Sequence, residues 1–180
     1  MVKRLPDRAY RVIGFVGTSR PVTRLHPHVY RLTGGRGPIG RNFGVQNVIV
    51  TMTGRKSGKT REIPLFAFQD GANYIVIGSN SGDDREPAWV GNLRAEPRAT
   101  LRVGRRHWTV RAHEAQAAER ERLWDLAATA YPGYEVYRTM TDRHIPVVVL
   151  EPAAADLEGR VGPAAPVAGP VAPAVDPEEA

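Results

Sequence analysis

The sequence contains no cysteine among its 180 residues. Disulfide bonds, thiolate metal sites and cysteine nucleophiles are therefore excluded, and the composition is compatible with a reducing cytoplasm. No run of 18 apolar residues exists, so the sequence predicts no membrane-spanning helix. The basic start of the chain is not followed by a continuous apolar stretch or a small-residue cleavage site, so we expect no signal peptide and a cytoplasmic protein.

Lysine is scarce, because only Lys3, Lys56 and Lys59 are lysines among the 25 basic residues. The formal net charge of +6 is also unevenly distributed. Residues 152–180 contain one arginine and five acidic residues, whereas residues 1–151 contain 24 basic and 14 acidic residues. A basic body of this kind indicates an anionic partner, which is a nucleic acid, a membrane surface, or a phosphorylated or polycarboxylate small molecule.

Composition divides the chain into three parts. The last 29 residues contain six prolines and nine alanines, too little apolar surface to offset the entropy of ordering, so we expect a disordered tail over residues 153–180. Residues 1–32 predict an N-terminal extension of one or two helices, interrupted at Pro21 and Pro27 because proline disrupts a helix interior. The folded domain is expected over residues 33–152, beginning with a glycine-rich loop at 33–44.

Short runs rich in Val, Ile, Thr and aromatic residues predict six β-strands. They cover residues 45–53, 60–69, 72–79, 99–103, 106–115 and 145–151. Three connections are hairpin-short and require antiparallel pairing, because a parallel crossover needs about a dozen residues or more. Helices are predicted over residues 87–95 and 116–131. The pattern is typical of a mainly β (α+β) protein, a six-stranded antiparallel β-barrel with flanking helices.

A basic hairpin joins the first two predicted strands. It is not a P-loop, because Gly54 and Gly58 enclose only three residues and a strand follows instead of a helix. In one interpretation four cations and a hydroxyl around a glycine-containing turn bind an anion. The residues are Arg55, Lys56, Ser57, Gly58, Lys59 and Arg61. The alternative is a solvated polar turn, although two of the three lysines lie here.

Two further segments carry candidate site residues. After the strand at 72–79, small polar residues form a loop, and the next helix places Trp89 and Asn92 three residues apart on one face. These residues either hold a flat ring or pack in the core. Tyr131, Tyr134 and Tyr137 either line a substrate pocket and deliver a proton or simply pack at a helix end.

The five histidines show no convincing ligand spacing with carboxylates, so no metal site is expected. No Gly-x-Ser-x-Gly elbow is present, and no protein nucleophile is expected. Trp108 and Trp124 are expected in the core.

Three separated motifs, taken in order, resemble the deazaflavin-dependent nitroreductase family of actinobacteria. They are MTGRKSGKTREIPL (52–65), GSNSGDDREPAWVGNL (78–93) and YPGYEVYRTMTDRHIPVVVLEP (131–152), with VYRLTGGRGPIGRNFG (29–44) upstream. The resemblance spans about residues 28–152. It implies a split β-barrel of the FMN-binding, flavin-reductase-like type. It also implies an oxidoreductase in which reduced deazaflavin coenzyme F-420 transfers hydride to an electron-poor small molecule such as a quinone or nitro compound.

The resemblance also implies roles for individual residues. The anionic tail of the coenzyme is expected against Arg55, Lys56, Ser57, Gly58 and Arg61. The flat ring is expected against Pro64, Leu65, Gly78, Ser79, Asn80, Trp89 and Asn92. The acceptor is expected to be oriented or protonated by Tyr131, Tyr134, Tyr137 or Ser79. Asn80 replaces a lysine that is frequent in the family, and Val90 replaces an aromatic residue; both are expected near the ring or the acceptor.

Two alternatives compete with this interpretation. FMN is the alternative cofactor, because its single phosphate suits the same hairpin. A non-enzymatic basic domain is the other, but the arginines are scattered instead of forming a stripe with interleaved aromatics, so no nucleic-acid partner is expected. The N-terminal arginines predict at most weak peripheral contact with the inner face of the membrane. Both a monomer and a homodimer fit the sequence.

Overall fold

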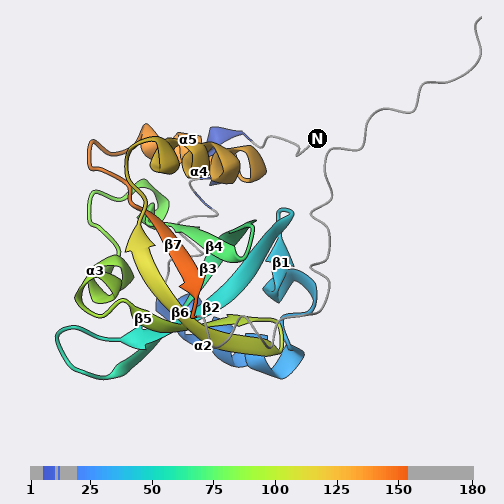
Figure 1. Cartoon of the computed structure of the whole chain (residues 1–180). Helices are drawn as coiled ribbons and strands as arrows, with labels where there is room; N and C mark the ends of the chain where they lie inside the picture. The colour runs from blue at the N-terminus through green and yellow to red at the C-terminus, as the bar shows by residue number, and fades with distance from the viewer. Residues whose placement is uncertain (1–5, 11, 13–19, 154–180) are drawn as a thin grey trace, which may run out of the picture.

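The computed structural model describes residues 6–10, 12 and 20–153. A β-barrel forms its centre, and in the view of Figure 1 helices α4 and α5 lie above the barrel and α2 lies below it. All but the first residue of the predicted tail over 153–180 falls outside the described residues, as does much of the predicted extension over 1–32. The division of the chain into three parts therefore stays a prediction.

The barrel consists of antiparallel strands in the order β2-β3-β4-β7-β6-β5, and β5 pairs with β2 to close it. The strands are β2 (Val45–Thr53), β3 (Thr60–Asp70), β4 (Asn73–Ile77), β5 (Arg98–Val103), β6 (Arg106–Glu114) and β7 (Val147–Pro152). Closure uses three residue pairs, from Ile49–Arg102 to Thr51–Thr100. The predicted six-stranded antiparallel barrel is confirmed.

The predicted loop over 33–44 contains two short elements instead. A 3-10 turn, η1 (Gly37–Ile39), precedes strand β1 (Arg41–Asn42), which pairs with the start of β2. Gly40 between them is closely packed, because a Cβ there would lie 1.6 Å from the backbone oxygen of Gly35. Its own carbonyl accepts hydrogen bonds from the backbone of Asn47 and from Gln46 Nε2, each 2.8 Å long. These contacts fix β1 against β2.

The helices are α2 (Arg20–Thr33), α3 (Ala88–Ala95), α4 (Ala117–Ala130) and α5 (Gly133–Arg138). The predicted helices over 87–95 and 116–131 correspond to α3 and α4. The expected break at Pro27 is wrong, because Pro27 lies inside α2 and is buried. Tyr30, one turn later, donates to Asn47 O and accepts from Gly104 N, both at 2.8 Å. Such tertiary contacts offset the backbone hydrogen bond that proline removes.

Strand alternation sends side chains to two separate cores. Val76, Leu101 and Val148 lie in the cluster enclosed by the barrel, whereas Ile75 and Val149 lie in the cluster covered by α4 and α5. Trp108 and Trp124 are 7% and 1% exposed, which confirms their placement in the core. Within the part of the chain that is described, no helix is both long enough and apolar enough to cross a membrane.

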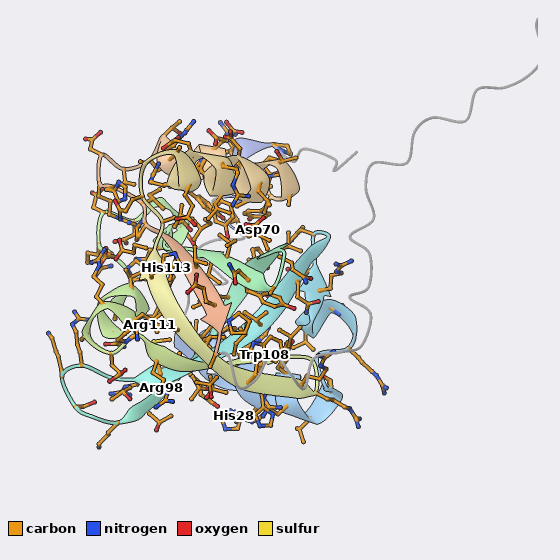
Figure 2. The ribbon with its side chains drawn as sticks, viewed as in Figure 1. His28, Asp70, Arg98, Trp108, Arg111 and His113 are labelled. Carbon is orange, nitrogen blue, oxygen red and sulfur yellow. The ribbon has the colours of Figure 1, made fainter. Side chains whose placement is uncertain are left out.

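His113 lies on β6 (Figure 2), between two carboxylates. Its Nε2 lies 3.9 Å from Glu119 and its Nδ1 lies 3.8 Å from Glu151. These are contacts of an exposed side chain with two separate carboxylates, and the described residues contain no group of three or more potential metal ligands.

Candidate active site

A cleft of about 1220 Å³, which we call the main cleft, lies beside strand β3. Its wall comes from α2, β1, β2, β3, α3, the 3-10 turn η2 (Asn80–Gly82) and the segment around α5. Among the sequence-predicted site residues, those that line it are Pro64, Leu65, Ser79, Asn80, Trp89, Tyr131, Tyr134 and Tyr137. The fold therefore brings residues of three separated motifs to one cavity.

A second cavity of about 430 Å³, the basic groove, lies on the hairpin between β2 and β3. Its predicted site residues are Arg55, Lys56, Ser57, Arg61, Trp89 and Asn92. Ala88 and Trp89 of α3, with Glu62 and Ile63 of β3, line both cavities. The basic groove and the main cleft therefore adjoin each other.

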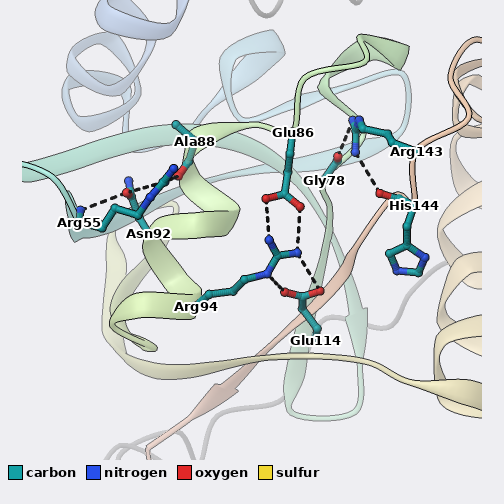
Figure 3. Close-up of polar contacts among 9 residues, drawn as sticks. All are labelled: Arg55, Gly78, Glu86, Ala88, Asn92, Arg94, Glu114, Arg143 and His144. Atoms are coloured by element: carbon teal, nitrogen blue, oxygen red, sulfur yellow. Dashed lines mark hydrogen bonds and ion pairs between the residues drawn. The ribbon is translucent and has the colours of Figure 1, made fainter.

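Hydrogen bonds tie the basic hairpin to helix α3. The backbone N–H of Arg55 donates to Asn92 Oδ1 at 3.1 Å, and Arg55 Nη1 donates to the carbonyl of Ala88 at 3.0 Å (Figure 3). Arg61 Nη2 lies 3.4 Å from Ser57 Oγ, to which it donates. Among the described residues, no ion pair involves Lys56 or Arg61, so their charges are available to an anion.

Gly58, Gly78 and Val90 line neither cavity. Gly58 has φ of +64° and shapes the hairpin turn. Gly78 lets the end of β4 pack closely, because a Cβ there would lie 2.7 Å from Pro146 Cγ and 3.0 Å from Val90 Cγ2. Val90 is 1% exposed and packs in the barrel core, so the expectation that it lies near the ring or acceptor stays a prediction.

The three predicted tyrosines belong both to the core and to the cleft wall. Tyr131, Tyr134 and Tyr137 are between 2% and 4% exposed, and the ring of Tyr131 packs 5.2 Å from that of Phe66. The Tyr131 and Tyr137 hydroxyls lie 3.2 Å apart, and Tyr137 Oη donates to the carbonyl of Tyr10 at 3.0 Å. Because no hydrogen bond of Tyr134 Oη is found among the described residues, its phenol is the one left to contact a ligand.

Burial keeps these phenols neutral. Loss of solvation raises the pKa of Tyr131, Tyr134 and Tyr137 above the ordinary value for tyrosine. A neutral phenol with a raised pKa donates hydrogen bonds but is a weaker acid than free tyrosine. The arrangement therefore favours orientation of a bound molecule over release of a proton to it.

Sequence reasoning assigned no role to Arg143, which holds the loop after β4. Its Nη2 donates to the carbonyls of Gly78 at 3.0 Å and Ser79 at 2.6 Å, and its Nε donates to the carbonyl of Asp83 at 2.9 Å (Figure 3 shows the contact with Gly78). Burial lowers the pKa of its guanidinium from the usual value. Because its partners are backbone carbonyls, which every residue has, no sequence pattern marks this role.

The segment that leads into α3 has a second anchor. Arg94 pairs with Glu86, Nη1 to Oε1 at 2.7 Å, and with Glu114 of β6 (Figure 3). Glu86 lines the main cleft, so this network fixes one rim of the cleft to the barrel.

We expect Arg143→Met to lower the free energy of unfolding by about 2 kcal/mol, because four backbone carbonyls, one of them that of His144, lose a charged donor. For a protein of this size that corresponds to a fall in Tm of roughly 4–8 °C, measured by thermal denaturation. Arg122→Met is the matched control, because Arg122 pairs with Asp70 at an exposed site. Exposed pairs contribute about 1 kcal/mol or less. Equal shifts of Tm in the two variants would contradict the anchoring role.

The closed antiparallel barrel thus carries an aromatic cleft that adjoins a basic groove. A family model described as F420H(2)-dependent quinone reductase matches residues 22–152. The chain belongs to this family. Its members are oxidoreductases that use reduced coenzyme F-420, which confirms the family resemblance, the enzyme class and the coenzyme expected from the sequence.

Individual relatives support the family assignment. An F420H(2)-dependent quinone reductase of Mycobacterium tuberculosis is 35% identical over 132 residues, which cover 71% of this chain and 87% of that protein. A solved F420-H2 dependent reductase is 40% identical with a TM-score of 0.55, over 58% of this chain and 93% of that one. A solved domain-swapped dimer is 34% identical with a TM-score of 0.56, over 71% and 95% of the two chains.

Proposed function

We propose that the protein reduces a quinone with hydride from coenzyme F-420, with the coenzyme tail in the basic groove and the ring and acceptor in the main cleft. The continuity of the two cavities through Ala88 and Trp89 carries this proposal. A flat ring joined to a phosphate-linked, polyglutamylated tail requires an apolar cavity next to a cationic one.

The residues divide by chemistry. Lys56 and Arg61 neutralise the tail, and Arg55 and Asn92 hold the hairpin and α3 in the shape of the groove. Trp89, which is 5% exposed and lines both cavities, forms the wall where ring and tail meet. Pro64, Leu65, Ser79 and Asn80 complete the lining around the ring.

When bound, reduced coenzyme F-420 supplies the hydride, so the protein needs no nucleophile of its own. The buried aromatic wall excludes water from the acceptor. Tyr134 Oη and the hydroxyl of Ser79 donate hydrogen bonds to a carbonyl oxygen of the acceptor and hold it in position. Tyr131 and Tyr137, bonded to each other and to the Tyr10 carbonyl, keep that wall rigid.

A quinone is the first candidate acceptor because the family and its relatives are described as quinone reductases. Asn80 Nδ2 donates to the carbonyl of Arg85 at 2.9 Å, so its amide serves the loop. The nitro compound is the second candidate acceptor.

The test is a fluorescence titration of the full chain with oxidised coenzyme F-420 and, in parallel, with FMN. We expect a Kd in the micromolar range or lower for the deazaflavin and binding at least about tenfold weaker for FMN, because one phosphate engages fewer cations than a polyglutamylated tail. Turnover of reduced coenzyme with a quinone panel and a nitroaromatic panel then identifies the acceptor. Absence of coenzyme binding up to millimolar concentration, or FMN retained through purification, would contradict the proposal.

Location and assembly stay predictions. We propose a cytoplasmic enzyme with at most weak peripheral membrane contact, either monomeric or homodimeric; a related solved chain forms a domain-swapped dimer.

A further inference from the structure

Three residues that line the main cleft each carry a buried polar atom with no hydrogen-bond partner among the described residues. The atoms are His26 Nδ1 of α2, Asn42 Oδ1 of β1 and Asn47 Nδ2 of β2. Asn47 is only 4% exposed. A buried polar atom without a partner costs about 1–3 kcal/mol, so the concentration of such atoms in residues that line one cavity indicates a ligand group that they bind.

The surrounding backbone holds Asn47 in place. Its carbonyl accepts from Tyr30 Oη and Gln46 Nε2, and its N–H donates to the carbonyl of Gly40, each at 2.8 Å. In the sheet Asn47 pairs with Phe66, which also lines the cleft. The amide is therefore a preorganised donor next to an aromatic wall.

His26 contributes a hydrogen-bond acceptor. Its ring stacks on Tyr30, with centroids 5.9 Å apart. Burial lowers the pKa of His26, so the neutral ring predominates near pH 7, and a neutral imidazole has one nitrogen that accepts a hydrogen bond. Nδ1 has no partner among the described residues, and we assign the acceptor to it.

The adjoining aromatic residues accommodate a ring. Tyr131 packs 6.3 Å from Phe43 and 5.2 Å from Phe66, and all three residues line the cleft. Phe43 directly follows Asn42. The unpartnered atoms thus lie on elements that also supply an aromatic surface.

We propose that His26, Asn42 and Asn47 form a polar subsite that binds a hydroxyl group carried by an aromatic acceptor. A hydroxyl can accept a hydrogen bond from Asn47 Nδ2 and donate one to His26 Nδ1 or Asn42 Oδ1. A methyl ether can accept a hydrogen bond but cannot donate one. A carboxylate would place its oxygens against two other hydrogen-bond acceptors. The inference rests on the proposed function, because it takes the main cleft as the acceptor site. It assigns a preference for hydroxylated aromatics that the quinone reductase activity alone does not require.

The test measures the binding of 2-naphthol and of 2-methoxynaphthalene by fluorescence titration of the full chain without coenzyme. The two ligands share the fluorescent ring, and the second carries a methyl ether in place of the hydroxyl. We expect the naphthol to bind about tenfold more tightly, the effect of one to two net hydrogen bonds. In Asn47→Leu and in His26→Phe/Asn42→Leu, which removes both acceptors, the ratio of the two Kd values is expected to fall below about threefold. Asn73→Leu is the matched control, because Asn73 starts β4 and does not line the cleft; it should keep the tenfold ratio.

Equal affinity for the two ligands in the unmodified chain would overturn the subsite, as would a tenfold ratio that persists in both variants. Should Asn47→Leu fail to fold, His26→Phe/Asn42→Leu decides, because it removes both acceptors of the hydroxyl and phenylalanine retains the stack on Tyr30. A chain that reduces quinones with coenzyme F-420 but binds the two naphthalenes equally contradicts the subsite alone. A chain that selects 2-naphthol but does not bind the coenzyme contradicts the proposed function and supports the subsite.

Discussion

The double variant Lys56→Ala/Arg61→Ala is expected to weaken binding of oxidised coenzyme F-420 by about 100-fold. Both side chains line the basic groove, and neither has an ion-pair partner among the described residues. Each charge-assisted hydrogen bond contributes about 1.5 kcal/mol or more, and two of them give a factor of roughly 100. Fluorescence titration measures the change, which should be smaller at high salt because salt screens the wild-type interaction.

The matched control is Arg106→Ala/Arg111→Ala, which removes the same charge from exposed positions on β6 (Figure 2 labels Arg111). This variant should bind the coenzyme within about twofold of the unmodified protein, because neither side chain lines the basic groove and exposed charges are screened by salt. Equal weakening in the two double variants would mean that overall charge, and not the groove, attracts the coenzyme.

Gly40→Ala is expected to lower the free energy of unfolding by about 3 kcal/mol, the upper part of the range for overpacking. The added Cβ would lie 1.6 Å from a backbone oxygen, and a backbone atom cannot turn away as a flexible side chain does. The expected fall in Tm is roughly 6–12 °C by thermal denaturation.

Gly37→Ala tests the cost of backbone conformation without a steric clash. A Cβ at Gly37 meets nothing within 4 Å, but the residue has φ of +66°. Gly40 has φ of −100°, which any residue adopts. Gly37→Ala is therefore expected to cost only about 1 kcal/mol. A smaller effect for Gly40→Ala than for Gly37→Ala would show that the loop relaxes readily.

The barrel was predictable because strand alternation and hairpin turns are local signals. The strand over 45–53 was predicted with its actual bounds, and the strand over 72–79 is shorter in the structure, as β4. Strand β1 escaped prediction because two residues carry no periodicity. The continuity of α2 through Pro27 depends on Tyr30 contacting Asn47 and Gly104, which lie far away in the sequence.

The candidate site shows the same division. Charged and aromatic side chains such as Lys56 and Trp89 were found by their type and spacing, and the fold places them in adjoining cavities. Arg143 was missed because it binds carbonyls, and Asn47 was missed because an unpartnered amide is visible only once its surroundings are known. Sequence patterns thus identified the charged and aromatic side chains of the site, but not the residues whose role depends on tertiary contacts.

The barrel closure has a consequence for how the molecule opens. The seam between β2 and β5 consists of three residue pairs, fewer than any other seam of the barrel. Because the fewest residue pairs hold this seam, we expect amide exchange with solvent to begin there. Once it is open, the remaining strands still form one continuous ladder, and the pairing of Asn47 with Phe66 at the cleft persists. The barrel can thus fluctuate while the site keeps its geometry.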